Sequence, residues 1–242
     1  MAKDEKQPND AELEKLLREI SYRAQGNAKS TLKISAWRFT VRSSYFVKRL
    51  MDIVGSAIGM LILSPVYLAI AIAVKLTSPG PAIFTQIRVG RNGRHFHIYK
   101  FRTMRADAEQ LKESLASQNE SKDGVIFKMK GDPRITKIGG FLRKTSMDEL
   151  PQLWNVFIGD MSLVGPRPPL PSEVREYTLE DRKRLNVVPG LTCLWQIKGR
   201  SEIPFHEQVR LDKEYIRSSG IWNDIVILCK TIPAIISGKG AY

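Results

Sequence analysis

Residues Ile53 to Val74 form an uncharged, mostly apolar run of about 22 residues, which would extend about 33 Å as a straight helix. That length is sufficient to cross the hydrocarbon layer of a bilayer. Ser64 and Pro65 stand near the middle of the run, where the proline removes a helical hydrogen bond and favours a kink. The run therefore allows two structures: a kinked crossing, or a hairpin broken at Ser64-Pro65 with two arms of about 16 Å each.

Basic residues flank this run on both sides: Arg42, Lys48 and Arg49 precede it, and Lys75, Arg88, Arg91 and Arg94 follow it. Because short segments rich in Lys and Arg stay on the cytoplasmic side, both ends are expected in the cytoplasm, which favours the hairpin. The Ser64 hydroxyl is the nearest donor for the carbonyl groups freed at the bend. Aromatic residues between Trp37 and Phe46 alternate with basic ones, which indicates an interfacial anchor and makes nucleic-acid binding the weaker interpretation.

The composition agrees with an anionic partner. The formal net charge is +13, which indicates nucleic acid, acidic lipid or a phosphorylated substrate. The two cysteines, Cys193 and Cys229, set no disulfide framework and fit a reducing compartment. The N-terminal 20 residues are mostly charged and polar, so no signal peptide is predicted. Residues 10–20 predict a short amphipathic helix whose partner stays open, followed by a polar linker to about Ser35.

Two strands and several helices are predicted after the apolar run. Ala82 to Val89 and His95 to Phe101 form a hairpin, with Asn92-Gly93 as its turn. His95 and His97 share a strand face but lack a third ligand, so we interpret them as ordinary surface or groove residues. Further helices are predicted at 105–119, from Pro171 to Arg184 and at 207–215, and residues 221–236 predict an interfacial or a core helix.

The candidate site centres on two adjacent carboxylates, Asp148 and Glu149, just before Pro151. They are expected at the N-terminal end of a short helix that stops near Gly159, where free N–H groups suit carboxylates, metal-bound water and phosphate. A capping box formed by Ser146 and Glu149 is the simpler explanation of the same spacing. The glycine- and arginine-containing loop 159–168 follows at once, which favours a magnesium and phosphate site.

Basic residues precede this pair. Lys100 and Arg102 close the predicted hairpin, and a second basic cluster runs from Lys128 to Lys137. Most such clusters are solvated surface, but this one leads directly into Arg143 and the acid pair. We therefore expect at least Arg134 and Arg143 to face a phosphate group.

The segments Arg143-Lys-Thr-Ser-Met-Asp-Glu-Leu-Pro-Gln-Leu-Trp-Asn-Val and Gly-Asp-Met-Ser-Leu-Val-Gly-Pro-Arg-Pro, 159–168, resemble the signature of the bacterial sugar transferases. These are monotopic phosphoglycosyl transferases of the bacterial inner membrane, and the resemblance covers Tyr45 to Tyr242. It implies an α+β fold with a re-entrant helix hairpin, and a small, mainly helical catalytic domain on the cytoplasmic face. It divides the chain into an N-terminal extension at 1–44, a membrane anchor at 45–81 and a transferase domain at 82–242.

The resemblance also implies the chemistry. Family members pass a sugar-1-phosphate from a UDP-sugar to a polyprenyl (undecaprenyl) phosphate and release UMP. It implies Asp148 as the nucleophile and Asp148 with Glu149 as ligands of Mg²⁺, while Glu149 as a base stays open. Phosphate contacts would come from five basic residues: Lys100, Arg102, Arg134, Arg143 and Arg167. The partners would be these two substrates and membrane lipid, with no nucleic acid, and the oligomeric state stays open.

Residues 188–201 resemble members that accept simple UDP-hexoses for exopolysaccharide, capsule or O-antigen synthesis, although the sequence does not name the sugar. Cys193 stands where such members commonly carry glycine, and nothing in the sequence indicates a low thiol pKa that would make it a nucleophile. A membrane-tethered, non-catalytic binder of anionic lipid or nucleic acid is the competing class. It explains the charge and the anchor but gives no reason for an acid pair among cations.

Overall fold

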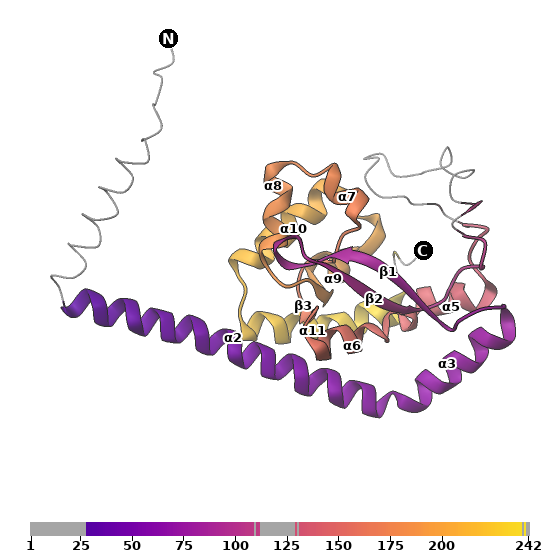
Figure 1. Ribbon diagram of the computed structural model, residues 1–242, viewed down its shortest axis with the longest axis horizontal. Coiled ribbons are helices and arrows are strands. Elements are labelled where there is room, and N and C mark those ends of the chain that lie inside the picture. The colour runs from indigo at the N-terminus through magenta and orange to yellow at the C-terminus, as the bar shows by residue number, and fades with distance from the viewer. Residues whose placement is uncertain (1–27, 109, 112–128, 130, 239, 241–242) are drawn as a thin grey trace, which may run out of the picture. The chain divides into compact units, whose positions relative to one another are not determined.

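The computed structural model describes residues 28–108, 110–111, 129, 131–238 and 240, with side chains from Ser43 onward except at 201. The chain divides into two units between Val47 and Lys48, and every candidate site residue lies in the second. The described part combines helices with two small sheets, as expected for an α+β chain (Figure 1). The first half contains α2 (Ala28–Ile62), α3 (Ser64–Thr77), β1 (Ile83–Val89), β2 (His95–Phe101), α5 (Lys137–Lys144) and α6 (Gln152–Ile158).

The second half contains β3 (Ser162–Val164), α7 (Pro171–Arg175), α8 (Leu179–Arg182), β4 (Gly190–Thr192), α9 (Leu194–Lys198), α10 (Phe205–Arg217) and α11 (Ile221–Ser237). Short 3₁₀ turns occupy Arg91–Gly93, Met147–Glu149, Lys183–Asn186 and Arg200–Glu202. The charged stretch after Pro171 is therefore helical as predicted, but it is divided into short pieces. The helices predicted at 207–215 and 221–236 are confirmed by α10 and α11.

The apolar run is broken at the predicted place. Helix α2 ends at Ile62, α3 begins at Ser64, and the pair is bent by 62°. The Ser64 hydroxyl donates to the Leu61 carbonyl at 2.8 Å, so the predicted donor at the bend is confirmed. Among the described helices, none is alone both long and apolar enough to cross a bilayer, whereas 43–62 and 64–77 reach that length and composition together, as a bent pair.

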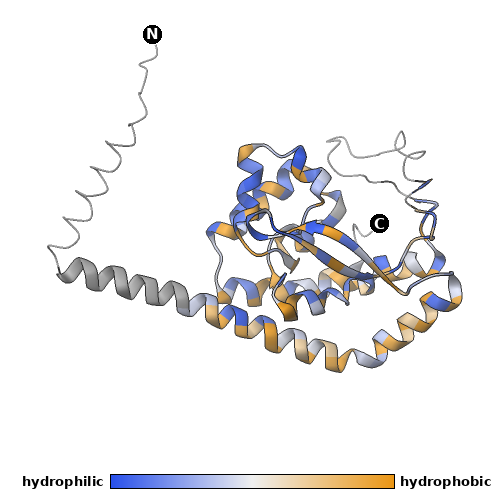
Figure 2. Cartoon of the chain, viewed as in Figure 1, coloured by the Kyte–Doolittle hydropathy of each residue, from blue (hydrophilic) through white to orange (hydrophobic). Residues whose placement is uncertain are grey.

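Apolar residues run along both arms of this pair (Figure 2). Ile70 and Val74 of α3 are buried against Phe101 and Leu142 in one of the core clusters. Other apolar side chains of the pair are exposed: Leu61, Ile62, Leu68 and Leu76 are each at least 64% accessible. The pair therefore has both buried and exposed apolar faces, and exposed apolar surface of this kind is typical of an interaction site.

One expectation about the N-terminal region is wrong. The polar linker was predicted to extend to about Ser35, but α2 already begins at Ala28. Residues 28–42 contain neither Gly nor Pro, so nothing stops the helix from continuing upstream of the apolar run. The amphipathic helix predicted at 10–20 lies outside the described residues. So does most of the helix predicted at 105–119, although residues 108, 110 and 111 are helical.

The predicted hairpin is present. Strands β1 and β2 pair antiparallel, with Ile83 opposite Phe101 and Val89 opposite His95. Its turn uses left-handed conformations at Asn92 and Gly93, with φ of 56° and 79°, as the Asn-Gly pair predicts. His95 and His97 are exposed, in agreement with their interpretation as surface residues.

A second, parallel pair of strands was not predicted. Ser162 pairs with Gly190 and Val164 with Thr192. At three residues each, these strands are too short to produce a detectable alternation of apolar residues. Gly165 and Gly190 allow the close approach, because a Cβ on Gly165 would lie 2.6 Å from the Val188 carbonyl oxygen.

Candidate active site

The acid pair is presented by a tight turn between α5 and α6. Helix α5 starts at its N-cap Thr136, whose hydroxyl accepts from the Gly139 amide at 3.0 Å. After α5, Ser146 adopts a left-handed conformation with φ of 55°, and Asp148 and Glu149 follow in the 3₁₀ turn. Helix α6 then ends at Gly159 with φ of 99°, close to the predicted stop.

The capping-box interpretation is wrong. Ser146 makes no side-chain cap, because its left-handed backbone turns the hydroxyl away from the following amides. The hydroxyl instead accepts a hydrogen bond of 2.6 Å from Arg200 Nη2. Arg200 thus supports the turn from a segment 54 residues away, a contact with no local signal in the sequence.

Lys100 brings strand β2 against the acid pair. Its Nζ lies 2.6 Å from Glu149 Oε1 and 4.0 Å from Asp148 Oδ2. Desolvation acts to raise the pKa of Glu149, but the charge and hydrogen bond of Lys100, with help from Arg167 and Gln152, hold that pKa below its ordinary value. Glu149 is therefore ionised at neutral pH.

Asp148 has a different environment. Its residue is 7% exposed, and burial raises the pKa of its carboxyl to about 6, with Glu149 adding to the rise and Lys100 and Arg143 opposing it. A desolvated carboxylate whose pKa lies near neutrality is a stronger nucleophile than a solvated carboxylate. Two adjacent carboxyl groups with opposite pKa shifts are typical of a functional site.

A hollow that is open to solvent lies beside Glu149, and Asp148 is not among its lining residues. Its polar lining combines one acid with three cations and two amides: Glu149, Lys100, Arg88, Arg167, Gln152 and Gln196. A hollow with this lining suits a multiply charged anion such as a diphosphate.

Arg167 enters this hollow from the loop after β3. Its Nη1 lies 3.7 Å from Glu173 Oε1, and Glu173 Oε2 also accepts from the Leu170 amide at 2.9 Å. Glu173 therefore orients Arg167 while its own position is fixed by the start of α7. The structure places Lys100, Glu149 and Arg167 around one hollow, as the sequence-based hypothesis requires.

Arg88 is a candidate that the sequence analysis missed as a site residue. It is 7% exposed, and burial, followed by the Arg167 charge, lowers the pKa of its guanidinium to about 9. Nη1 donates to the Pro168 carbonyl at 3.1 Å and Nη2 to Gln86 at 2.8 Å, while buried Nε has no partner among the described residues. A charged residue inside an apolar strand was the available signal.

The other predicted cations have different surroundings. Arg143 Nε donates to the Thr103 hydroxyl at 3.0 Å, and Asp148 lies within its electrostatic reach. Arg102 Nη2 donates to the carbonyl and hydroxyl of Ser78 at 2.7 and 2.8 Å, which fastens the end of α3. Arg134 forms a buried ion pair with Asp132 at 2.6 Å. Neither Arg102 nor Arg134 lines the hollow, so their phosphate-binding role stays a prediction.

Two carboxylates are available for a metal ion. The described residues contain no group of three or more His, Cys, Asp or Glu side chains placed to hold one, which excludes a closed zinc site of the usual kind in this part of the chain. Mg²⁺ commonly uses one or two carboxylates and takes its other ligands from water and substrate phosphates. Asp148 and Glu149 beside the hollow therefore fit Mg²⁺. Cys193 is buried, and burial raises the pKa of its thiol, which agrees with its exclusion as a nucleophile.

The chain is similar to known proteins over the part that carries these features. Residues 43–238 match the family model for bacterial sugar transferases. The galactosyl transferase CpsE of Streptococcus agalactiae is 50% identical over 205 residues, which cover 84% of this chain and 45% of that protein. The UDP-glucose:undecaprenyl-phosphate glucose-1-phosphate transferase of Escherichia coli is 41% identical over 204 residues, covering 81% of this chain and 41% of that protein.

The exopolysaccharide production protein ExoY of Rhizobium meliloti is 37% identical over 198 residues, which are 81% of this chain and 88% of ExoY. The structure is a small α+β unit in which one member of the acid pair, Glu149, lines a hollow with three cations. The chain belongs to the bacterial sugar transferase family. It spans less than half the length of several of the curated relatives that it matches.

Proposed function

We propose that this protein transfers a sugar-1-phosphate from a UDP-sugar to a polyprenyl phosphate and releases UMP. The observation that carries this proposal is the buried Asp148 beside Glu149 and Lys100, two residues that line a hollow together with Arg88 and Arg167. Such a site neutralises a diphosphate and offers it a carboxylate nucleophile. Relatives named for the transfer of a sugar-1-phosphate or of galactose support the same reaction class.

In the first step, an Asp148 carboxylate oxygen attacks the phosphorus next to the sugar. The new oxygen–phosphorus bond forms as the bond to the bridging oxygen breaks, and UMP leaves with that electron pair. Because an anion attacks an anion, charge neutralisation by Lys100, Arg167 and Arg88 supplies a large part of the barrier lowering. Mg²⁺ held by Asp148 and Glu149 would add positive charge at the same phosphate oxygens.

In the second step, a phosphate oxygen of the polyprenyl phosphate attacks the phosphorus of the aspartyl phosphate. The Asp148–phosphorus bond breaks, the carboxylate is regenerated and the lipid carries a diphosphate-linked sugar. Glu149 can receive a proton from the acceptor phosphate or hold the metal ion. Its pKa below the ordinary value favours metal binding, because a strongly ionised carboxylate is a weak base.

The sugar stays open, since relatives of similar identity are named for galactose, N-acetylgalactosamine and glucose. The reaction itself is tested by UMP release from a panel of UDP-sugars, with Mg²⁺ and undecaprenyl phosphate present. We expect release from at least one UDP-hexose and its loss when a chelator removes the divalent cation. A membrane-tethered binder without catalytic activity would bind the anionic lipid and release no UMP from any sugar of the panel.

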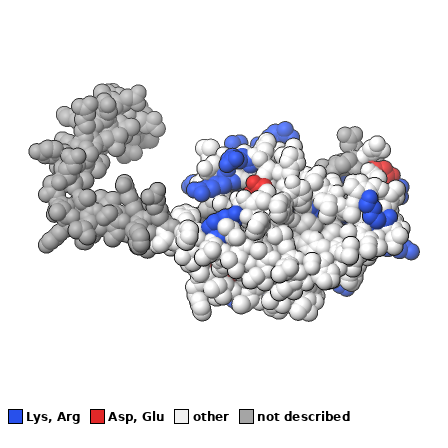
Figure 3. All heavy atoms as spheres, turned by 60° about the horizontal axis from the view of Figure 1, so that its bottom comes forward, with Lys and Arg blue, Asp and Glu red and all other residues white. Residues whose placement is uncertain are grey.

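We further propose that the bent pair α2–α3 is a re-entrant membrane anchor and that the catalytic residues face the cytoplasm. The exposed apolar side chains of the pair support this, as do those of neighbouring elements, including Trp154 and Ile158 of α6 and Trp222 and Ile236 of α11. Figure 3, which turns the bottom of Figure 1 forward, shows a broad area poor in charge, with Lys and Arg gathered away from it. A surface of this composition is suited to the boundary of a bilayer.

The topology has a direct test. Ser30→Cys and Asn92→Cys, each in a background with Cys193→Ser and Cys229→Ser, place one thiol before and one after the bent pair. A re-entrant anchor keeps both thiols in the cytoplasm, so both should resist an impermeant reagent added to intact cells and react after lysis. Labelling of the Ser30→Cys variant from outside would establish a crossing and overturn the re-entrant proposal.

Pro65 should matter for the same topology. Pro65→Leu restores a backbone donor and permits a continuous helix, so we expect a fraction of the molecules to expose the Ser30→Cys thiol outside the cell. The shift should stay partial because the basic residues on both flanks still oppose crossing. A Pro65→Leu protein labelled like its parent would remove Pro65 as a determinant of the bend.

A further inference from the structure

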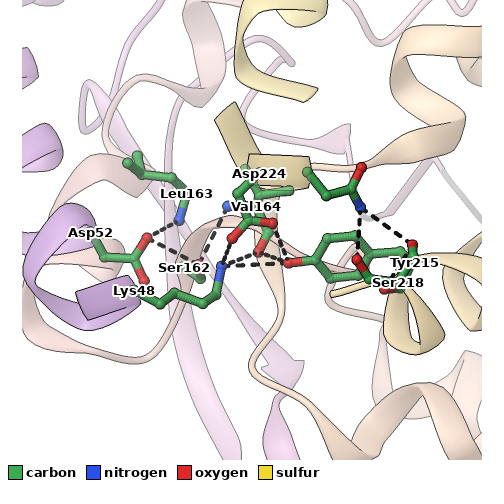
Figure 4. A network of polar contacts seen from close by, with 9 residues as sticks. Lys48, Asp52, Ser162, Leu163, Val164, Tyr215, Ser218 and Asp224 are labelled. Carbon is green, nitrogen blue, oxygen red and sulfur yellow. Dashed lines mark hydrogen bonds and ion pairs between the residues drawn. The ribbon is translucent and has the colours of Figure 1, made fainter. Parts of the chain in front are cut away.

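The strand β3 is held in place by side chains of the anchor helix α2. Asp52 Oδ1 accepts from the Leu163 amide at 2.9 Å and from the Ser162 hydroxyl at 3.0 Å. One turn earlier, Lys48 Nζ donates to the Val164 carbonyl at 3.1 Å. These contacts give β3 hydrogen-bond partners in addition to β4, the one strand that pairs with it among the described residues (Figure 4).

The Lys48 ammonium group also contacts a helix near the C-terminal end of the chain. It forms an ion pair of 2.5 Å with Asp224 of α11, whose side chain is completely buried. The Tyr215 hydroxyl of α10 lies 2.8 Å from Asp224 Oδ1 and 3.0 Å from the Val164 carbonyl oxygen (Figure 4). The end of β3 is thus enclosed by α2, α10 and α11, and its backbone cannot move without breaking buried polar contacts.

Helix α2 also packs closely on this region. A Cβ on Gly55 would lie 2.9 Å from Leu163 Cδ1, and one on Gly59 would lie 3.1 Å from Leu153 Cδ1. Lys48, Asp52, Gly55 and Gly59 follow one another at helical spacing, so they form a single face of α2. This face combines two charged residues with two glycines, which indicates a dedicated contact with the catalytic unit.

The segment after β3 enters the active site. Gly165-Pro166-Arg167-Pro168 follows Val164 directly, and two prolines limit how far this segment can deform. The far end of this segment is held because Arg88 Nη1 donates to the Pro168 carbonyl. Its near end is held because Gly165 N donates to Thr192 O at 2.9 Å. A shift of β3 must therefore be transmitted along a short, stiff segment to Arg167.

We propose that Asp52 and Lys48 are positioning residues: through β3, they set the place of the Arg167 guanidinium in the hollow beside Glu149. This inference rests on the proposed function and assigns a catalytic consequence to the anchor helix. A purely structural role for the same residues would lower stability without acting through Arg167. The two roles differ in their dependence on Arg167.

The test is a double-mutant cycle between Asp52 and Arg167, with kcat/KM of UMP release as the measured quantity. Asp52→Leu removes the acceptor of the Leu163 amide and should lower kcat/KM by about 10²-fold, the scale expected for a misplacement of about 1 Å. Asp52→Asn keeps an acceptor oxygen and should retain activity within about tenfold of wild type. In an Arg167→Ala background, Asp52→Leu should lower kcat/KM by less than about a further threefold, because the group that it misplaces is already absent.

Ser56→Ala is the matched control. Ser56 is completely buried one turn along α2, and its hydroxyl donates only to the Asp52 and Ile53 carbonyls of its own helix. It should leave kcat/KM unchanged in both backgrounds. If Asp52→Leu does not fold, Lys48→Met combined with Asp224→Asn removes both charges of the buried pair together, and the cycle is run with that protein.

The outcomes separate this inference from the proposed function. No UMP release by wild type would contradict the proposed function, whereas full activity of Arg167→Ala would contradict the role of Arg167 on which the positioning inference depends. If both proteins behave as expected and Asp52→Leu has the same effect with and without Arg167, the positioning role is contradicted. Asp52→Asn that is as impaired as Asp52→Leu would contradict it too, because the acceptor oxygen would then not be the feature that matters.

Discussion

Asp148→Asn should abolish turnover while the protein stays folded. The amide keeps the shape of the side chain but is a poor nucleophile and a weak metal ligand, so the loss in kcat should be at least about 10²-fold. We expect the melting temperature to be no lower than that of wild type, because burial raises the pKa of Asp148 and its ionised form is therefore disfavoured by the fold. The measurements are UMP release from the UDP-sugar that wild type prefers, and thermal unfolding.

Asp107→Asn controls for the replacement of a carboxylate by an amide. Asp107 is a partly exposed carboxylate paired with Arg105, and its loss should leave turnover unchanged. An Asp148→Asn protein that keeps activity within a few-fold of wild type would remove Asp148 as the nucleophile. An unfolded Asp148→Asn protein would contradict the expectation that the fold tolerates a neutral group at this position.

Lys100→Met should have the second-largest effect. Lys100 is the only described cation that forms ion pairs with both carboxylates. Without it the two acids repel each other, the pKa of Asp148 should rise above about 6, and the transferred phosphoryl group loses a compensating charge. We expect kcat to fall by about 10²- to 10³-fold at neutral pH, as for loss of a preorganised donor.

The pH profile distinguishes the two contributions of Lys100. Wild-type activity should fall as the pH decreases through about 6, since the protonated Asp148 carboxyl cannot attack phosphorus. In Lys100→Met this acid limb should move to higher pH, and Lys100→Arg should restore part of the activity. Lys137→Met, which removes an exposed lysine of α5, should change neither the rate nor the profile. An unshifted acid limb in Lys100→Met would contradict control of the Asp148 pKa by Lys100.

The local elements of the fold were accessible to sequence reasoning because each has a local cause. The Ser64-Pro65 break, the Asn92-Gly93 turn and the Gly159 helix stop follow from backbone preferences of single residues. The parallel pair of β3 and β4 was missed because three-residue strands carry no periodicity, and their pairing depends on glycines 25 residues apart in the chain, Gly165 and Gly190.

The candidate site likewise contains residues that the sequence indicated and residues that it did not. Asp148, Glu149 and Arg167 stand in recognisable segments, and the hollow includes Glu149 and Arg167 as expected. Arg88, Arg200 and Asp52 were missed as functional residues, since each acts through a contact with a distant segment. Arg102 and Arg134 contact Ser78 and Asp132 in the folded chain and do not line the hollow, so their role at a phosphate stays a prediction.

The most direct test of the central claim is a single-turnover experiment without the lipid acceptor. Wild-type protein is incubated with its preferred UDP-sugar and Mg²⁺, and UMP and the mass of the peptide containing Asp148 are measured. A phospho-aspartyl intermediate predicts release of UMP up to one equivalent per protein, and a sugar-phosphate adduct on Asp148 that disappears when undecaprenyl phosphate is added. UMP release that strictly requires the acceptor, with no adduct on Asp148 at any time, would contradict the covalent mechanism.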